Sequence, residues 1–372
     1  GVIMIKMLQL NLGSQYGGVE RHIEDIVNYI DKELFKVTIV CRKNTKFEKK
    51  MKIIASKSKN IKVISIEVKK INLIKIIKSI NSYINLEGIQ IIHCHGITSS
   101  IIGNIVKSSR NKVITSVHGY SNLDRLDKGK ITKFIFNFLE KISCECSDIC
   151  IAVSKDIKRY LIEKKIDEKK IKVVTHGVSN KNIKYSKSKK LKKNIIISSI
   201  GRLEKVKGYD ILIRAIAECK VHGYDKIKCK IAGVGSEREY LENLIVELDI
   251  IEQCELVGFK EDITNFLQDS DIYIQPSIIE SFGISIIEAM GIGIPVIGTN
   301  SGGIKEIIDH NIDGMLFKKN NYKDLAEKII NLLEDEDKRR YLSYNGVEKV
   351  EKEFNVEEKI KNIEDIIKSL IY

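Results

Sequence analysis

The feature that most constrains the fold is a regular alternation of short apolar runs with longer amphipathic segments, which continues through most of the chain. Short runs rich in Ile and Val are typical of buried strands, and the segments between them have helical periodicity. The predicted strands of the first half are Ile5–Leu10, Lys36–Val40, Lys62–Ile66, Ile89–His93, Val113–Val117, Ile149–Val153 and Ile171–Val174. Those of the second half are Ile195–Ile200, Lys228–Ala232, Cys254–Val257, Ile272–Gln275, Pro295–Gly298 and Gly314–Phe317. Strands that alternate with helices form parallel sheets covered by helices, so the sequence predicts an α/β protein.

The length of the chain and one polar stretch predict two domains. A chain of 372 residues is long for one hydrophobic core and sufficient for two. Between the two sets of strands, Asn180 to Asn194 is polar and Lys-rich and has no apolar periodicity, as is typical of a linker. We therefore predict one domain at residues 1–180, a linker at 181–194 and a second domain at 195–355. Apolar residues recur at helical spacing in Lys359–Tyr372, which predicts a C-terminal helix within residues 356–372.

Charge is distributed unevenly between the two halves. The net charge is +13, but residues 1–190 contain 38 Lys and Arg against 17 Asp and Glu, whereas the remainder contains 25 against 33. A strongly basic half indicates an anionic partner, such as lipid headgroups, a lipid-linked phosphate or nucleic acid. The alternative is a compositional bias towards Ile, Lys and Asn, which does not explain the acidic second half. No nucleic-acid-binding module is recognisable, so we predict no nucleic-acid partner.

Hydropathy and cysteine usage predict a cytoplasmic protein. No stretch reaches 18 consecutive apolar residues, so a transmembrane helix is not expected. The apolar run Val2–Leu10 contains Lys6 and lacks a cleavage site of small residues, so it predicts a first strand rather than a signal peptide. The eight cysteines have no paired metal spacing and several lie in strand-like runs, which indicates buried thiols in a reducing compartment.

Two carboxylates, Glu280 and Glu288, lie just beyond one predicted strand of the second half. The strand Ile272–Gln275 is followed by Pro-Ser, a Gly-containing turn and a short apolar helical pattern, Ile284–Met290. The first carboxylate therefore lies on the loop that leaves a strand, and the second lies within the next helix. In an open α/β sheet such a loop borders the ligand crevice. Carboxylates there can accept hydrogen bonds from the hydroxyls of a sugar and of a ribose.

The pattern Glu-x7-Glu, preceded by Pro-Ser and enclosing Phe-Gly, resembles the donor-site motif of the retaining glycosyltransferases of family 4, which have the GT-B fold. Further segments resemble motifs of that family in the expected order: Gly17-Gly18-Val19-Glu20, Val117-His118-Gly119, Ala152-Val153-Ser154-Lys155, Ser199 to Gly208, Gly233-Val234-Gly235 and Thr299 to Gly303. The resemblance covers residues 17–317. It implies two Rossmann-like domains that face each other across a cleft, the first binding an acceptor and the second a nucleotide sugar. It also implies that helix 356–372 packs back on the first domain.

The resemblance implies a role for each matching residue. Arg202 and Lys207 would hold the donor diphosphate, since Arg offers a planar fork and Lys a point charge for phosphate oxygens. Glu280 would contact the hydroxyls of the donor sugar, Glu288 the ribose, and His118 would support the sugar from the acceptor side. The candidate catalytic residues are His118, Arg202, Lys207 and Glu280. The candidate donor-binding residues are Gly17, Gly18, Gly201, Arg202, Lys207, Gly233, Gly235, Glu280, Phe282, Gly283, Ile284 and Glu288.

Two glycine pairs precede predicted helices. Gly17-Gly18 lie before Val19–Ile30, and Gly302-Gly303 lie before Ile304–Ile308. Glycine in front of a helix lets backbone N–H groups reach phosphate oxygens without a Cβ in the way. The alternative, that these glycines only make tight turns, stays open for both pairs.

Three other motifs are excluded from the predicted site. In His93-Cys94-His95 we expect alternating side chains at a strand end to point to opposite faces, which argues against a metal site. Asp269-Ser270-Asp271 mimics a metal motif of another glycosyltransferase fold, but it precedes a strand, where the resembled family has a structural join. His176 takes no catalytic role, because the family often has Asn at this place. We predict no metal and no cofactor.

The predicted function is transfer of a hexosyl group, with retention and without an obligatory metal, from a nucleotide sugar, with UDP-sugars favoured. The predicted acceptor is a glycan or a lipid-linked glycan in bacterial cell-surface polysaccharide synthesis. The basic first half predicts peripheral attachment to the anionic inner face of the plasma membrane. The alternatives are a nucleotide-sugar epimerase of the same fold and an NAD-dependent oxidoreductase, although the three-glycine dinucleotide fingerprint is missing.

Overall fold

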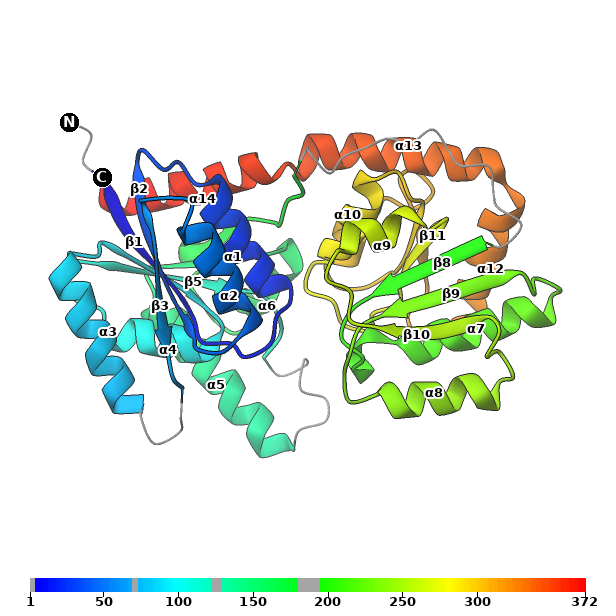
Figure 1. The fold of residues 1–372 in the computed structure, drawn as a ribbon, viewed down its shortest axis with the longest axis horizontal. Helices are drawn as coiled ribbons and strands as arrows, with labels where there is room; N and C mark the ends of the chain where they lie inside the picture. Colours follow the sequence, from blue (N-terminus) through cyan, green and yellow to red (C-terminus); the bar gives the residue numbers. More distant parts are fainter. Residues whose placement is uncertain (1–3, 69–72, 122–128, 180–194) are drawn as a thin grey trace. The chain divides into compact units, whose positions relative to one another are not determined.

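The computed structural model describes residues 4–68, 73–121, 129–179 and 195–372. The chain forms two compact units, drawn in Figure 1. The N-terminal unit comprises Gly1–His176 together with Val356–Tyr372, and the C-terminal unit comprises Gly177–Asn355. Each unit is a parallel sheet interleaved with helices, which confirms the predicted α/β class. The linker predicted at 181–194 lies outside the described residues.

The N-terminal unit contains a seven-stranded sheet with the order β3-β2-β1-β4-β5-β6-β7, in which neighbouring strands are parallel. Its strands are β1 Ile5–Asn11, β2 Phe35–Arg42, β3 Ile61–Ile66, β4 Ile91–His95, β5 Lys112–Val117, β6 Ile149–Ala152 and β7 Ile171–Val173. Its helices are α1 Gly18–Tyr29, α2 Lys46–Ala55, α3 Leu73–Glu87, α4 Ile97–Ile105, α5 Lys130–Cys146, α6 Lys155–Glu163 and α14 Val356–Ile371, with a 3-10 turn at Glu168–Lys170.

Both faces of this sheet are covered, because successive residues of a strand point to opposite faces. Ile5 and Met7 of β1 belong to one core with α1, α2 and α14. Leu8 and Leu10 belong to a second core with α3 and α4. Burial on both faces explains why β1 carries apolar residues at both odd and even positions rather than on one face alone.

The C-terminal unit contains a six-stranded parallel sheet with the order β10-β9-β8-β11-β12-β13. Its strands are β8 Ile195–Ile200, β9 Ile227–Ala232, β10 Cys254–Gly258, β11 Ile272–Gln275, β12 Val296–Thr299 and β13 Met315–Phe317. Its helices are α7 Tyr209–Val221, α8 Arg238–Glu247, α9 Ile263–Gln268, α10 Ile284–Gly291, α11 Ile304–Ile307, α12 Tyr322–Glu334 and α13 Glu336–Glu353, with a 3-10 turn at Lys205–Lys207.

All thirteen predicted strands are present, and their ends differ from the prediction by at most two residues. The shift at β4 matters for function. The prediction ended this strand at His93, but it continues to His95, which pairs with Ser116 of β5. The strand ends where Gly96 adopts a positive φ of 80°. Two histidines therefore lie inside a strand that is buried along its whole length.

The strand orders fix where each unit can bind a ligand. In the N-terminal unit the chain moves outward from β1 in one direction and from β4 in the other. In the C-terminal unit the same reversal lies between β8 and β11. At such a switch point the two following connections pass to opposite faces of the sheet and leave a crevice at the carboxyl edge. A ligand site is therefore expected at these two edges.

The helices and the cysteines of the described residues can be compared with the sequence predictions. No helix among the described residues is long and apolar enough to cross a membrane. Seven cysteine thiols are buried and Cys146 is exposed.

Helix α14 returns to the N-terminal unit and completes its core. Val356, Ile360, Ile363 and Ile367 are buried with residues of α1, including Ile23. The carboxylate of Glu364 accepts a hydrogen bond from the backbone N–H of Asp31 at 2.7 Å, just beyond the end of α1. The apolar stripe predicted at the C-terminus is thus a core face.

We expect Ile363→Ala to lower the free energy of unfolding of the N-terminal unit by about 2–5 kcal/mol, because it leaves a cavity in a core where Ile363 is fully buried. The matched control is Lys361→Ala on the exposed face of α14, which should change it by less than roughly 0.5 kcal/mol. Urea unfolding followed by circular dichroism measures both. Equal unfolding midpoints for the two variants would contradict this packing role.

Candidate active site

The loops at the switch point of the C-terminal unit bring a lysine and a glutamate together. The segment Gly201–Gly208 follows β8, and the loop with Glu280 follows β11, the neighbouring strand. Lys207 Nζ donates to Glu280 Oε2 at 2.7 Å. The two side chains are only 16% and 12% exposed, so the pair is screened less by water than a surface ion pair. Two residues 73 positions apart thus form one charged site.

The carboxylate of Glu280 is held from its own loop as well. Its Oε2 accepts a hydrogen bond from Ser277 Oγ at 3.0 Å, and Gln275 Nε2 lies 3.4 Å away. Gln275 is buried and accepts from Tyr273 Oη at 2.5 Å and from Ser285 Oγ at 3.0 Å. This network fixes the position of the Glu280 carboxylate before any ligand arrives.

The predicted glycines of this unit allow backbones to approach closely. A Cβ on Gly233 would lie 1.8 Å from the carbonyl oxygen of Gly201, and one on Gly235 would lie 2.2 Å from that of Leu203. Contacts this short are impossible for any other residue. The loops that follow β8 and β9 are therefore packed directly on each other, which holds Gly201 and its neighbour Arg202 in place.

Gly302 and Gly303 support the Glu280 loop from the other side. Gly302 has a φ of 53°, and a Cβ there would lie 2.3 Å from the carbonyl oxygen of Glu280. The N–H of Gly303 donates to that same oxygen at 2.9 Å. The following helix, α11, has only four residues. The structure thus favours the packing interpretation of this glycine pair over a phosphate-binding helix terminus.

The remaining predicted donor-binding residues of this unit lie on the same loops. Arg202 is half exposed and pairs with Glu204 at 2.6 Å, an ion pair weak enough to exchange for another anion. Phe282 is buried and packs edge-on against Phe354. Gly283, with a φ of 119°, precedes α10, which begins at Ile284 and carries half-buried Glu288.

Gly17 and Gly18 lie at the switch point of the N-terminal unit. Helix α1 begins at Gly18, and the N–H of Gly17 donates to Glu20 Oε2 at 2.9 Å. Glu20 Oε1 accepts from Asn11 Nδ2 at 2.9 Å. Burial is the main cause of a raised pKa for Glu20. The Gly17 N–H is therefore engaged in capping α1 in this structure.

His118 follows β5 and belongs to a cluster of five histidines. It is half-buried, whereas His22, His93, His95 and His176 are buried. The ring centroid of His118 lies 5.3 Å from those of His22 and His95 and 5.8 Å from that of His176. The members come from α1, from β4 and from the segments that follow β5 and β7.

The clustered imidazoles are neutral near pH 7, because burial disfavours the charged form. Burial lowers the pKa of His22 to about 4 and, with a smaller contribution from His22, that of His93 to about 3. The pKa values of His95, His118 and His176 lie well below the usual value, again mainly through burial.

The expectation that alternating side chains of His93-Cys94-His95 point to opposite faces is confirmed, since Cys94 packs in the core with α3 and α4 while His93 and His95 lie together on the other face. Residues two apart on a strand share a face, and their ring centroids are 4.3 Å apart. His93 Nε2 lies 2.7 Å from Ser116 Oγ, and His95 Nε2 lies 2.7 Å from Gln9 Oε1. Within the described ranges, no group of three or more His, Cys, Asp or Glu side chains is arranged to hold a metal ion.

The Asp269-Ser270-Asp271 motif has a structural contact. Asp271 Oδ2 accepts a hydrogen bond from the backbone N–H of Ile196 at 2.8 Å. This hydrogen bond connects the start of β11 to β8. Asp271 lies at the amino end of β11, whereas Glu280 lies beyond its carboxyl end.

The sequence prediction missed the groups that hold the site residues, namely Gln9, Gln275, Ser277 and the four buried histidines. A usable signal was present. Gln9, His93 and Gln275 are polar residues near the carboxyl ends of otherwise apolar strands, where a buried polar group requires a partner.

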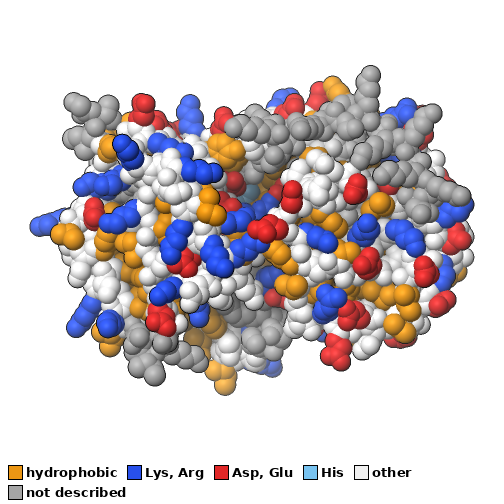
Figure 2. Space-filling view, viewed as in Figure 1, with side chains coloured by type: hydrophobic (Ala, Val, Ile, Leu, Met, Phe, Trp, Pro, Cys, Tyr) orange, Lys and Arg blue, Asp and Glu red, His pale blue; other side chains and the backbone are white. Residues whose placement is uncertain are grey.

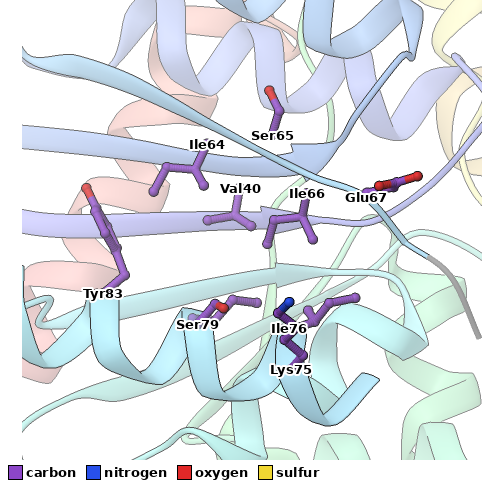
Figure 3. A pocket seen from close by; sticks show the side chains of 10 residues that line it. Val40, Ile64, Ser65, Ile66, Glu67, Lys75, Ile76, Ser79 and Tyr83 are labelled. Carbon is purple, nitrogen blue, oxygen red and sulfur yellow. The ribbon is translucent and has the colours of Figure 1, made fainter. Parts of the chain in front are cut away.

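A hollow of about 420 Å³ lies elsewhere in the N-terminal unit, between β3 at the edge of the sheet and α3. Figure 3 shows its apolar floor, with Ile64 and Ile66 facing α3, Tyr83 at one end and Glu67 near the other. None of the predicted site residues lines it, so it is separate from the candidate site.

Known proteins and family models match both halves of the chain. The family described as Glycosyltransferase Family 4 matches residues 16–181, and that described as Glycosyl transferases group 1 matches residues 180–349. An uncharacterized glycosyltransferase of Methanocaldococcus jannaschii is 30% identical over 375 residues, which cover 99% of each chain. The UDP-Gal:alpha-D-GlcNAc-diphosphoundecaprenol alpha-1,3-galactosyltransferase of Escherichia coli is 24% identical, over 97% of this chain and 96% of that protein.

A solved structure shows the fold. HepE of Anabaena, crystallised in complex with UDP-glucose, matches with a TM-score of 0.84 at 20% identity, over 98% of this chain and 100% of that one. Both halves of the chain thus match a family model, and one relative matches over nearly the whole length. The chain belongs to the group 1 glycosyltransferases, of the family-4 type with the GT-B fold.

Proposed function

We propose that the protein transfers a hexosyl group from a UDP-sugar with retention of anomeric configuration and without an obligatory metal. The observation that carries this proposal is the Lys207–Glu280 pair at the switch point of the C-terminal unit, with Arg202 on the same loop as Lys207. A sugar diphosphate presents hydroxyls next to phosphate oxygens. The Glu280 carboxylate, 2.7 Å from the Lys207 ammonium, offers a hydrogen-bond acceptor for the sugar hydroxyls. The ammonium offers a cation for the phosphate oxygens.

In this proposal the positive side chains stabilise the leaving group. Lys207 and Arg202 bind the diphosphate, on which negative charge develops as the bond to the sugar breaks. These two cations supply the charge that a metal ion would otherwise provide. Glu280 accepts hydrogen bonds from the sugar hydroxyls, and Glu288 on α10 binds the ribose.

Retention follows if the acceptor oxygen attacks from the face that the diphosphate leaves. The bond from the anomeric carbon to the phosphate oxygen breaks, the bond to the acceptor oxygen forms, and the departing phosphate takes the acceptor proton. Glu280 suits a positioning role in this step, because its carboxylate is paired with Lys207 and accepts from Ser277. No general acid or nucleophile is assigned to it.

The names of similar proteins support the choice of donor and acceptor. HepE was crystallised with UDP-glucose, and the Escherichia coli relative is named for UDP-Gal and a lipid-linked diphosphoundecaprenol acceptor. We extend these by analogy to a UDP-sugar donor and a glycan or lipid-linked glycan acceptor for this chain. The proposed location is the cytoplasm, at the inner face of the membrane.

A thermal-shift screen tests the donor site. UDP and UDP-glucose at about 100 times the dissociation constant should stabilise the protein by about 2.7 kcal/mol, with a corresponding rise in Tm. Arg202→Ala and Glu288→Ala should lose most of this shift, because each removes one contact to the donor. Lys205→Ala is the matched control, since Lys205 is an exposed cation on the same loop that carries no proposed contact, and its shift should equal that of the native protein. Stabilisation by GDP or ADP instead of UDP would contradict the proposal that the donor is a UDP-sugar. Equal shifts in Arg202→Ala and Lys205→Ala would contradict the proposed position of the donor site.

One helix supports the proposed membrane attachment. Helix α5 buries only Glu140, Ser143 and Cys144, which lie in its C-terminal half. Five large apolar side chains follow one face at helical spacing and are 39–78% exposed: Ile131, Phe134, Ile135, Phe138 and Ile142. Figure 2 shows orange side chains at the lower edge of the view, where Figure 1 draws this helix.

The charges on α5 complement an anionic surface. Lys130 and Lys141 flank the apolar face, although Lys141 also pairs with Glu145 at 3.6 Å, and the carboxylate of Glu140 is buried against Lys164. A helix with an apolar face and flanking lysines lies in the interface of an anionic bilayer, with its apolar side chains among the acyl chains. Helix α5 is therefore the proposed contact surface.

Liposome flotation tests this contact. The native protein should float with vesicles containing phosphatidylglycerol and less with pure phosphatidylcholine, because both the lysines and the apolar face contribute. Phe134→Glu should reduce the bound fraction several-fold. The control is Leu86→Glu, since Leu86 is 84% exposed on α3 of the same unit, and it should bind like the native protein. Binding that is unaffected by Phe134→Glu, or equal for the two lipids, would count against the proposal.

A further inference from the structure

A buried chain of hydrogen bonds leads from β1 to His118. Gln9 Oε1 lies 2.7 Å from His95 Nε2, and His95 Nδ1 lies 3.0 Å from His118 Nε2. Gln9 and His95 are buried, and His118 is half-buried. The chain therefore runs outward from the interior of the sheet, across the switch point between β1 and β4, to the residue that the family motif places at the reacting sugar.

The positions of the protons along these hydrogen bonds follow from the group next to Gln9. Gln9 Nε2 lies 3.5 Å from Met7 Sδ, and a thioether sulfur can accept but cannot donate. The amide nitrogen of Gln9 therefore faces Met7, and its carbonyl oxygen faces His95. A neutral imidazole has one donor and one acceptor nitrogen. His95 must donate from Nε2 to Gln9 and accept at Nδ1, so His118 must donate from its Nε2.

We propose that Gln9 and His95 are positioning residues that hold His118 as its Nε2–H tautomer in a fixed ring orientation. The assignment depends on no ligand, but its catalytic meaning rests on the proposed glycosyl transfer. The transition state of that reaction carries positive charge at the anomeric carbon. A protonated imidazole nearby would oppose this charge. A neutral ring whose proton is already donated to His95 adds neither a cation nor an acid.

The neighbours of His118 include three further imidazole rings besides that of His95. His22 of α1 and His176 after β7 lie with their Nδ1 atoms 3.2 Å apart, so one donates to the other. His93 of β4 is bonded to Ser116 and touches His95. Charging any one of these buried imidazoles would place an uncompensated cation among the others. The cluster is thus polar enough to orient His118 without adding charge.

Imidazole ¹⁵N NMR on protein labelled at its seven histidines tests the inference directly, because it distinguishes protonated from bare ring nitrogens. His118→Gln identifies the signals of His118. In the native protein at pH 7.5 we expect a protonated Nε2 and a bare Nδ1 for His118. His95→Leu removes the acceptor, so the single tautomer should be lost and both forms should be seen. His95→Asn places Oδ1 near the former Nδ1 and should restore the native pattern.

Gln9→Leu should mix the His118 tautomers like His95→Leu, because His95 is then no longer fixed. Ser116→Ala is the matched control, since it removes the partner of His93 in the same cluster and should leave the His118 tautomer unchanged. Melting temperatures measured for all variants verify folding. A native His118 protonated at Nδ1, or the same His118 spectrum in His95→Leu and His95→Asn, would overturn the inference. A missing UDP-induced shift in the native protein would count against the proposed donor and not against this result.

Discussion

The candidate site depends on the close approach of the loops that leave β8 and β11. This approach brings Lys207 Nζ and Glu280 Oε2 to 2.7 Å. Two crowded backbone contacts make this possible, one at Gly233 against Gly201 and one at Gly302 against Glu280. In both places a single methyl group would lie within 2.3 Å of a carbonyl oxygen. The glycines therefore stabilise the site indirectly, since they set the positions of the loops that carry the charged groups.

The two units place different chemistry at the same topological position. In the C-terminal unit the switch point carries the Lys207–Glu280 ion pair, whose side chains are mostly shielded from water. In the N-terminal unit it carries a cluster of imidazoles whose pKa values are lowered mainly by burial. A charged edge suits a diphosphate, and an uncharged polar edge suits a sugar that becomes positive during transfer. The common fold provides the location, and the strand-end residues determine the chemistry.

Local pattern was sufficient to predict the strands and the loop position of Glu280, because both depend on a few consecutive residues. The histidine cluster could not be predicted in this way, since His22, His118 and His176 come together only after the sheet has formed. The common face of His93 and His95 is a local property, because residues two apart on a strand share a face. The exposed face of α5 was also hidden in the sequence. An apolar stripe indicates burial of a helix face, but it does not reveal whether protein or another phase covers it.

Helix α5 links the exposed apolar face to the segment that carries His118. Glu140, near its C-terminal end, is buried and accepts hydrogen bonds from Ser121 Oγ and Tyr160 Oη, each at 2.8 Å, and pairs with Lys164. Ser121 lies three residues after His118, so the backbone beyond His118 is fixed to the same helix whose other half is exposed. The ring of His118 is held separately by His95. A buried carboxylate with three partners resists displacement, since loss of Lys164 would leave its charge uncompensated and loss of a hydroxyl would remove a hydrogen bond. The position of α5 relative to the His118 segment is therefore set by this network.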